Sequence, residues 1–300
     1  MDLSVPTAIP TWRVGIIGAG RVGAVLGAAL RAAGHDVVAA AGTSDATRLR
    51  LETLLPHLTP SDPYDVARAA DLLLLTVPDD ALADLVERLA ADGTLRPGQV
   101  VVHTSGRHGT GVLAAAAEVG ALTLALHPVM TFTGTDVDLE RLPGIVFGLT
   151  AGPRGRVVGE RLAADLGARA VLVPEEQRTA YHAALAHGAN HLVTLVGQSM
   201  DLLRAAGSTD PAAVLRPLLQ AALDNGLAYG DAALTGPVVR GDTRTVAAHL
   251  DALADADPTT RDSYRVLAQA TAHRAAVDGR LTPERAAEIA ALLGGDRASA

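Results

Sequence analysis

The chain has 300 residues, enough for about two domains, and its 49% hydrophobic and 19% charged residues favour a globular over a disordered protein. Only seven residues are aromatic (2 Phe, 4 Tyr and 1 Trp) and the formal net charge is −8. So few aromatic rings disfavour a surface on which nucleic-acid bases stack. The negative net charge disfavours a surface that binds a phosphate backbone or an anionic membrane, since both need an excess of basic residues. No Cys is present, which excludes disulfides, thiolate metal sites and a thiol nucleophile.

All 25 basic side chains are Arg, since the sequence contains no Lys. A Walker lysine, a Schiff-base lysine and a Tyr-x-x-x-Lys pair are therefore excluded as well. Met1 to Pro6 lack the basic and apolar regions of a secretory signal. No apolar stretch reaches about eighteen residues without a charge or a breaker. We therefore expect a cytoplasmic protein that does not span a membrane.

Short apolar runs alternate with helical patterns in the first half of the chain. Strands are predicted at 14–17, 37–41, 71–77, 100–103, 122–126 and 145–149, with helices at 21–33 and 79–91. Strands that alternate with helices imply right-handed crossovers and a doubly wound, mostly parallel sheet.

The pattern changes after about Ala151. One further strand is predicted at 170–173, and helices at 174–206, 211–229, 242–254, 259–277 and 283–293. The sequence thus predicts an α/β protein. A doubly wound Rossmann-type domain would occupy residues 1–152, and an all-α C-terminal domain residues 153–300.

A glycine-rich turn lies between the first predicted strand and helix. It reads Gly18-Ala19-Gly20-Arg21-Val22-Gly23, a G-x-G-x-x-G. In a dinucleotide site the first glycine allows the tight turn, the second admits the pyrophosphate and the third lets the helix pack on the strand. The free N–H groups at the helix start then face the anion. This setting predicts a nucleotide site.

The end of the second predicted strand favours NADP over NAD. An NAD-binding domain usually places an acid there to hold the ribose 2′-hydroxyl. This chain has Thr43 and Ser44 instead, with Arg48 one turn on, and these groups suit a 2′-phosphate. Asp45, a carboxylate close by in the sequence, is the one argument against NADP. Further along, Val77 and Pro78 end a central strand, where contact with the nicotinamide ribose is predicted; a strand-ending proline is the alternative.

Several motifs together carry a resemblance to a known family. They are Thr76-Val77-Pro78-Asp79, His103-Thr104-Ser105-Gly106, Leu126-His127-Pro128, Tyr181-His182-Ala183-Ala184 with Asn190, and the run from Ala233 to Asp242. With these, the chain resembles the six-phosphogluconate-dehydrogenase-like reductases. More narrowly it resembles the Rossmann-like proteins with a helical domain of unknown function, a set that includes an alternate ketopantoate reductase. The resemblance implies NADP, a small carboxylate substrate and a homodimer. Related reductases use a catalytic Lys, which this chain lacks.

Candidate catalytic residues follow the predicted strands and lie on the long helix. Ser105 is a candidate donor to a substrate carbonyl or a capping serine, and His127 a site residue or a turn-fixing one. We predict that His182 with Asn190 forms the acid–orienter pair that replaces the lysine. Pairing with a neighbouring helix is their alternative role, and Tyr181 is the second choice as acid.

His187 and His191 have the i, i+4 spacing of a zinc pair. No third ligand is evident, so no metal site is predicted.

The loop from Thr235 to Asp242 is the predicted substrate-binding segment. Arg240 is a candidate clamp for a carboxylate, with Asp242 holding it or capping the next helix. A structural Arg–Asp bridge would look the same in the sequence.

The leading hypothesis is an NADPH-dependent reductase of a small keto acid, with ketopantoate to pantoate as the best single example. Reduction of a cyclic imine such as pyrroline-5-carboxylate is the runner-up. The alternatives are a non-catalytic NADP-binding sensor or scaffold and a deazaflavin-linked reductase.

Overall fold

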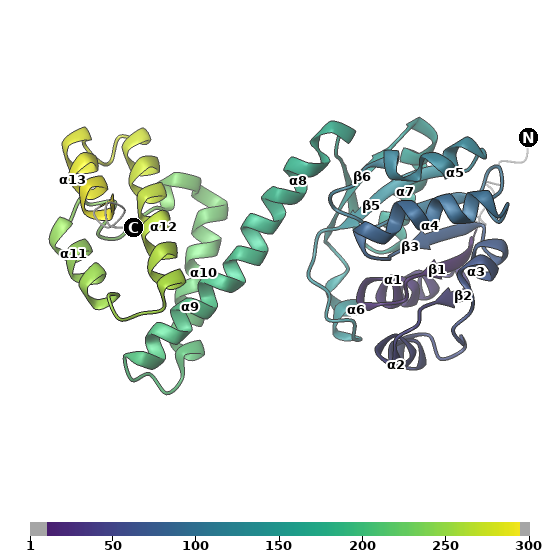
Figure 1. Cartoon of the computed structure of the whole chain (residues 1–300), viewed down its shortest axis with the longest axis horizontal. Helices are drawn as coiled ribbons and strands as arrows, with labels where there is room; N and C mark the ends of the chain where they lie inside the picture. Colours follow the sequence, from purple (N-terminus) through teal and green to yellow (C-terminus); the bar gives the residue numbers. More distant parts are fainter. Residues whose placement is uncertain (1–10, 295–300) are drawn as a thin grey trace, which may run out of the picture. The chain divides into compact units, whose positions relative to one another are not determined.

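The computed structural model describes residues 11–294, which belong to two compact units, Met1–His187 and Gly188–Ala300 (Figure 1). The predicted boundary after residue 152 precedes a helix, α7 (Pro153–Asp165), and a strand, β7 (Arg169–Leu172), that both belong to the first unit. Among the described residues no helix is long and apolar enough to cross a membrane.

The first unit is built on one seven-stranded sheet. Its strands are β1 (Arg13–Ile17), β2 (Asp36–Ala41), β3 (Leu72–Leu75), β4 (Val100–His103), β5 (Leu122–Pro128), β6 (Val146–Ala151) and β7, in the order β2-β1-β3-β4-β5-β6-β7. Strands β1 to β5 are parallel, which confirms the predicted doubly wound fold. β6 runs antiparallel to β5, a reversal that the apolar pattern of a strand does not reveal.

Helices cover both faces of this sheet. They are α1 (Arg21–Ala32), α2 (Asp45–Leu54), α3 (Pro63–Ala69), α4 (Asp79–Ala91), α5 (Ala114–Glu118), α6 (Val137–Arg141) and α7. One buried core contains Leu26 of α1 and Leu162 of α7, and the other contains Val66 of α3 and Leu85 of α4. Because both faces are buried, β3 is apolar at every position.

The long helix predicted at 174–206 is interrupted. A 3₁₀ turn (Glu175–Gln177) leads into α8 (Arg178–Leu185), a π-helical segment (Ala186–Asn190) follows, and α9 (His191–Ala205) begins directly after it. Inserted π-helical turns occur frequently at functional sites. The division between the two units falls inside this segment.

The second unit is helical, as predicted, with α9, α10 (Pro211–Tyr229), α11 (Thr243–Ala252), α12 (Pro258–Val277) and α13 (Pro283–Gly294). Asp210 and Asp257 explain two of the helix starts, because each precedes a proline and caps its helix. Asp210 accepts one backbone N–H of the first turn and Asp257 accepts two. Its core is formed by α11, α12 and α13 and includes Val246, Ala275 and Ile289.

Candidate active site

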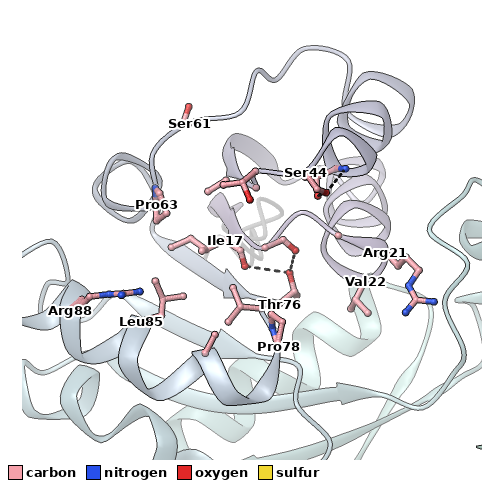
Figure 2. A pocket seen from close by; sticks show the side chains of 18 residues that line it. Ile17, Arg21, Val22, Ser44, Ser61, Pro63, Thr76, Pro78, Leu85 and Arg88 are labelled. Atoms are coloured by element: carbon pink, nitrogen blue, oxygen red, sulfur yellow. Dashed lines mark hydrogen bonds between the residues drawn. The ribbon is translucent and has the colours of Figure 1, made fainter.

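A cleft of about 720 Å³ opens at the carboxyl ends of β1, β2 and β3 (Figure 2). The strand order changes direction at β1, which lies between β2 and β3, and ligands of open α/β sheets bind at such a switch point. The cleft is lined by Ile17, Gly18, Gly20, Arg21, Val22, Ala41, Gly42, Thr43, Ser44, Thr47, Ser61, Pro63, Thr76, Val77, Pro78, Ala81, Leu85 and Arg88.

The glycine turn has the geometry that a dinucleotide site needs. Gly18 has a φ of +94°, and a methyl group there would meet the backbone of Thr76 at 2.8 Å. A methyl group at Gly23 would lie 2.3 Å from the Thr76 hydroxyl, so α1 packs closely on the residue that follows β3. Thr76 in turn donates from its hydroxyl to the Gly18 carbonyl oxygen at 2.6 Å. Gly20 borders the cleft, and a methyl group there would meet only the Gly18 carbonyl oxygen, at 3.8 Å.

The charges around the cleft suit an anionic ligand. None of the described residues that line it is a carboxylate, whereas Arg21 and Arg88 are both present. Figure 2 places Arg88 at one end of the cleft and Arg21 at the other. Arg21 also begins α1, whose first-turn N–H groups have no helical carbonyl to bond.

The predicted phosphate-binding residues differ in their placement. Thr43 and Ser44 line the cleft, and the Ser44 hydroxyl caps α2 by accepting from the Thr47 N–H at 3.1 Å. Arg48 is paired instead with Asp45 on the exposed side of α2 and does not line the cleft. Ala19, from the glycine turn, is fully buried in the core.

Sequence reasoning missed the far wall of the cleft. It is formed by Ser61, by Pro63 at the start of α3, and by Ala81, Leu85 and Arg88 of α4. Leu85 and Arg88 lie three residues apart on a predicted helix that follows Val77 and Pro78, so a helical projection from Pro78 would have indicated this face.

A second group of polar side chains lies at the ends of β4 and β5. His103 is buried and donates from Nε2 to the Gly109 carbonyl oxygen at 2.8 Å, while its Nδ1 accepts from the Ser105 N–H. The Ser105 hydroxyl oxygen accepts from the N–H groups of Arg107 and His108. Ser105 therefore fixes the loop, and its own proton stays available to a ligand.

His127 and Tyr181 share a hydrogen bond of 3.0 Å between Nδ1 and the phenolic oxygen. The His182 ring lies edge-on to the His127 ring with 6.0 Å between their centres. A methyl group at Gly148 of β6 would lie 2.4 Å from the Tyr181 oxygen, so this glycine leaves the space in which the phenol lies. We call His127, Tyr181 and His182 the His–Tyr cluster; all three side chains are half-buried.

Burial controls the protonation of this region. It lowers the pKa of His127 to about 4, and the nearby charge of Arg178 acts in the same direction. The pKa of His103 is also lowered to about 4, chiefly by burial. Burial raises the pKa of Tyr181. At neutral pH the two histidines are neutral and the phenol keeps its proton.

The predicted partner of His182 belongs to the other unit. Asn190 closes the π-helical segment and lies in the second unit, whereas His182 lies in the first. The His182–Asn190 pair therefore stays a prediction. Tyr181, the second choice from the sequence, makes the observed contact with His127.

The predicted substrate loop lies within the second unit. Asp242 caps α11 by accepting from the N–H and the hydroxyl of Thr245. Within the described chain Arg240 forms no ion pair, and its side chain is exposed. Thr235 borders a cavity of about 320 Å³ in this unit, together with His249 and Tyr264. The capping role of Asp242 is thus the one that the structure contains.

Family models match both halves of the chain. Residues 4–128 match a Rossmann-like domain, and residues 145–271 match DUF2520, a domain of unknown function. A search of curated protein sequences finds no match.

Solved structures match over nearly the whole chain. A provisional NADP oxidoreductase of Bacteroides fragilis is 23% identical with a TM-score of 0.74, covering 88% of this chain and 98% of its own. A reductive aminase of Aspergillus terreus, solved with NADPH4, cyclohexanone and allyl amine, is 18% identical with a TM-score of 0.66, covering 93% and 99%. An imine reductase of a Pseudomonas species is 18% identical with a TM-score of 0.62, covering 95% and 99%.

At these identities the likeness establishes a shared fold. The part of the resemblance that these findings test is confirmed: a Rossmann-like match is followed by a match to DUF2520, and structures named as an NADP oxidoreductase and a reductive aminase share the fold.

Proposed function

We propose that the chain is an NADPH-dependent reductase of a small keto acid, with ketopantoate as the first substrate to test. The observation that carries this proposal is the cleft, which holds a glycine turn, two arginines and no carboxylate among its described lining residues. The structures of similar fold whose names include NADP or NADPH support the same choice of cofactor.

The residues of the cleft fit each part of the cofactor. The N–H groups at the start of α1 would hold the pyrophosphate. Thr43 and Ser44 would take the ribose 2′-phosphate, where a carboxylate would repel it. The apolar wall that includes Pro63 and Leu85 would pack on the adenine, and Val77 would lie by the nicotinamide.

When bound, NADPH would supply a hydride to the carbonyl carbon, and the π electrons of the carbonyl group would move to its oxygen. The oxygen then needs a proton, and the Tyr181 hydroxyl is suited to give it. When His127 carries its proton on Nδ1, it donates to the Tyr181 oxygen across the 3.0 Å contact, which leaves the phenolic proton free to transfer. Ser105 can donate a further hydrogen bond to the same oxygen.

Reduction of an imine is the second candidate. The reductive aminase and the imine reductase of similar fold favour it. Both candidates use the same cofactor and the same cleft, and they differ in the charge of the group that accepts the hydride.

A binding measurement tests the cofactor, and turnover tests the reaction. We expect NADPH to bind at least about tenfold more tightly than NADH, a difference of about 1.4 kcal/mol. Replacing Arg21 or Arg88 by Ala should weaken NADPH binding, whereas Arg154→Ala, at an exposed position on α7, should not. Equal affinities for the two cofactors would contradict the NADP assignment. Loss of NADPH that requires ketopantoate or a cyclic imine would identify the reaction.

A further inference from the structure

Arg178, the first residue of α8, is a buried cation beneath the His–Tyr cluster. Its side chain is 1% exposed, although arginine is almost never buried without a charged partner. Nε donates to the Thr150 hydroxyl oxygen at 2.7 Å. Nη2 donates to the carbonyl oxygens of Ala125 at 3.1 Å and Gly148 at 3.0 Å. Nη1 donates to the carbonyl oxygen of Ser105 at 3.4 Å.

These acceptors have two consequences. They belong to β5, to β6 and to the loop after β4, so one side chain ties α8 to three neighbouring chain segments. All four are neutral oxygens, and among the described residues none forms an ion pair with Arg178. The guanidinium is therefore solvated mainly by dipoles. Burial lowers its pKa and Glu175 acts in the opposite direction, but arginine remains a cation in proteins. Its carbon lies 5.7 Å from the centre of the Tyr181 ring.

Two carboxylates act on this region, Asp79 on His127 and Glu175 on Arg178, and each has partners of its own. Glu175 accepts hydrogen bonds from the Thr110 and Gly111 N–H groups at 2.8 and 3.0 Å. Asp79 has a side chain that is 38% exposed and lies 3.9 Å from Arg107. At His127 the Arg178 charge has a larger effect on the pKa than the Asp79 carboxylate, which acts in the opposite direction. Among the charges that act on His127, the positive charge of Arg178 therefore has the largest effect.

We propose that Arg178 is a positioning residue whose buried charge makes the His–Tyr cluster select an anionic carbonyl substrate over a protonated imine. A positive potential in a site of low dielectric stabilises a substrate carboxylate and the negative charge that develops on the reduced oxygen. It opposes the positive charge of an iminium group. This inference rests on the proposed reductase function and chooses between its two candidate substrate classes.

Small substrates that differ in charge test the inference. Ketopantoate carries a carboxylate, ketopantoyl lactone is its neutral counterpart, and 1-pyrroline becomes cationic on protonation. For the wild type we expect kcat/KM for ketopantoate to exceed that for the lactone at least tenfold. Arg178→Lys should keep most of this ratio and Arg178→Met should lower it about tenfold. Arg154→Met, at an exposed position, should leave it unchanged.

Histidine NMR gives a second readout that needs no turnover. Removing the Arg178 charge should raise the pKa of His127 above its value of about 4, while Arg178→Lys should change it less. A purely structural role for Arg178 would not separate the Lys and Met variants in this way.

The outcomes separate the inference from the proposed function. If no substrate supports NADPH oxidation, the reductase proposal fails, and the His127 titration still tests the effect of the Arg178 charge. If 1-pyrroline or the lactone is reduced as well as ketopantoate, the reductase proposal stands and the inference is overturned. Circular dichroism shows whether Arg178→Met folds. If it does not fold, the inference is judged from the ratio of kcat/KM for ketopantoate to that for the lactone in the wild type and in Arg178→Lys. A ratio near one in the wild type would overturn it.

Discussion

The hydrogen bond between His127 and Tyr181 is the contact on which proton delivery depends in this account. His127 was a candidate from the sequence because it ends a predicted strand. Tyr181 was ranked below His182 as the proton donor. A helical projection gives the angle between two side chains on one helix, but it does not say which face meets the sheet. Burial of Arg178 fixes that face, and Tyr181 lies three residues later on it. Buried, unpaired arginines are rare, so no sequence pattern announced this one.

Tyr181→Phe tests the role of the phenol. Loss of the proton donor should lower kcat by about 10²–10⁴-fold, the usual contribution of general acid catalysis, while KM for NADPH stays the same. Steady-state kinetics measure both constants. Tyr229→Phe, which removes a hydroxyl from an exposed side chain on α10, is the matched control. If Tyr181→Phe is fully active and His182→Gln is not, His182 is the acid, as the sequence first suggested.

The buried histidines predict a pH-dependent stability. Each would titrate near 6.5 when unfolded but has a pKa of about 4 in the fold, so between these values the unfolded chain binds more protons. The free energy of unfolding should therefore fall with falling pH, by up to about 1.4 kcal/mol per pH unit for each histidine. Urea unfolding between about pH 7 and 5 measures this. His103→Gln should reduce the slope, and a flat profile in the wild type would contradict the account.

At the scale of elements, the sequence predicted best the segments with the strongest local signals. The β1–turn–α1 unit was predicted correctly because the strand is apolar and the turn carries three glycines at the spacing of a dinucleotide site. The short helices α3, α5 and α6 were missed, since five to seven residues show too few turns for a clear period. The antiparallel β6 and the division inside the long helix follow from tertiary packing, which one segment does not encode.

Gly23→Ala tests the packing of α1 on the glycine turn and on Thr76, the residue that follows β3. The added methyl group would lie 2.3 Å from the Thr76 hydroxyl and 2.6 Å from the Gly18 carbonyl oxygen, so the turn has to move. We expect a loss of about 1–3 kcal/mol in the free energy of unfolding and weaker NADPH binding. Denaturant unfolding and cofactor titration report the two effects. Gly152→Ala, where a methyl group meets open space, should show neither; an equally mild result for Gly23→Ala would remove the steric argument.

At the scale of the whole molecule, α9 and α10 leave large apolar side chains exposed, among them Val193, Leu218 and Leu227. Exposed apolar surface of this kind marks an interaction site, and we expect a homodimer. Light scattering should give a mass of twice 30.6 kDa. Leu218→Glu should shift the protein toward the monomer, whereas Leu49→Glu, at an equally exposed position on α2, should not. A monomeric wild type at micromolar concentration would contradict this expectation.

The order of an α/β part followed by a helical part was readable from the sequence, because alternating strands and helices give way to helices alone. The division between the units, at His187 and Gly188, lies well after the predicted boundary at residue 152. The proposed chemistry depends on the cleft and on the His–Tyr cluster. Both lie in the first unit, at the carboxyl edge of the sheet formed by β1 to β5.

Transfer of deuterium from labelled NADPH is the most direct test of the reductase assignment. The protein would be mixed with NADPH that carries deuterium at the transferable position of the nicotinamide, together with ketopantoate, and the product analysed by mass spectrometry. The account predicts pantoate with one deuterium on the reduced carbon. Tight NADPH binding with no deuterium in any keto acid or imine product would contradict it, and would favour a protein that binds NADP without turnover.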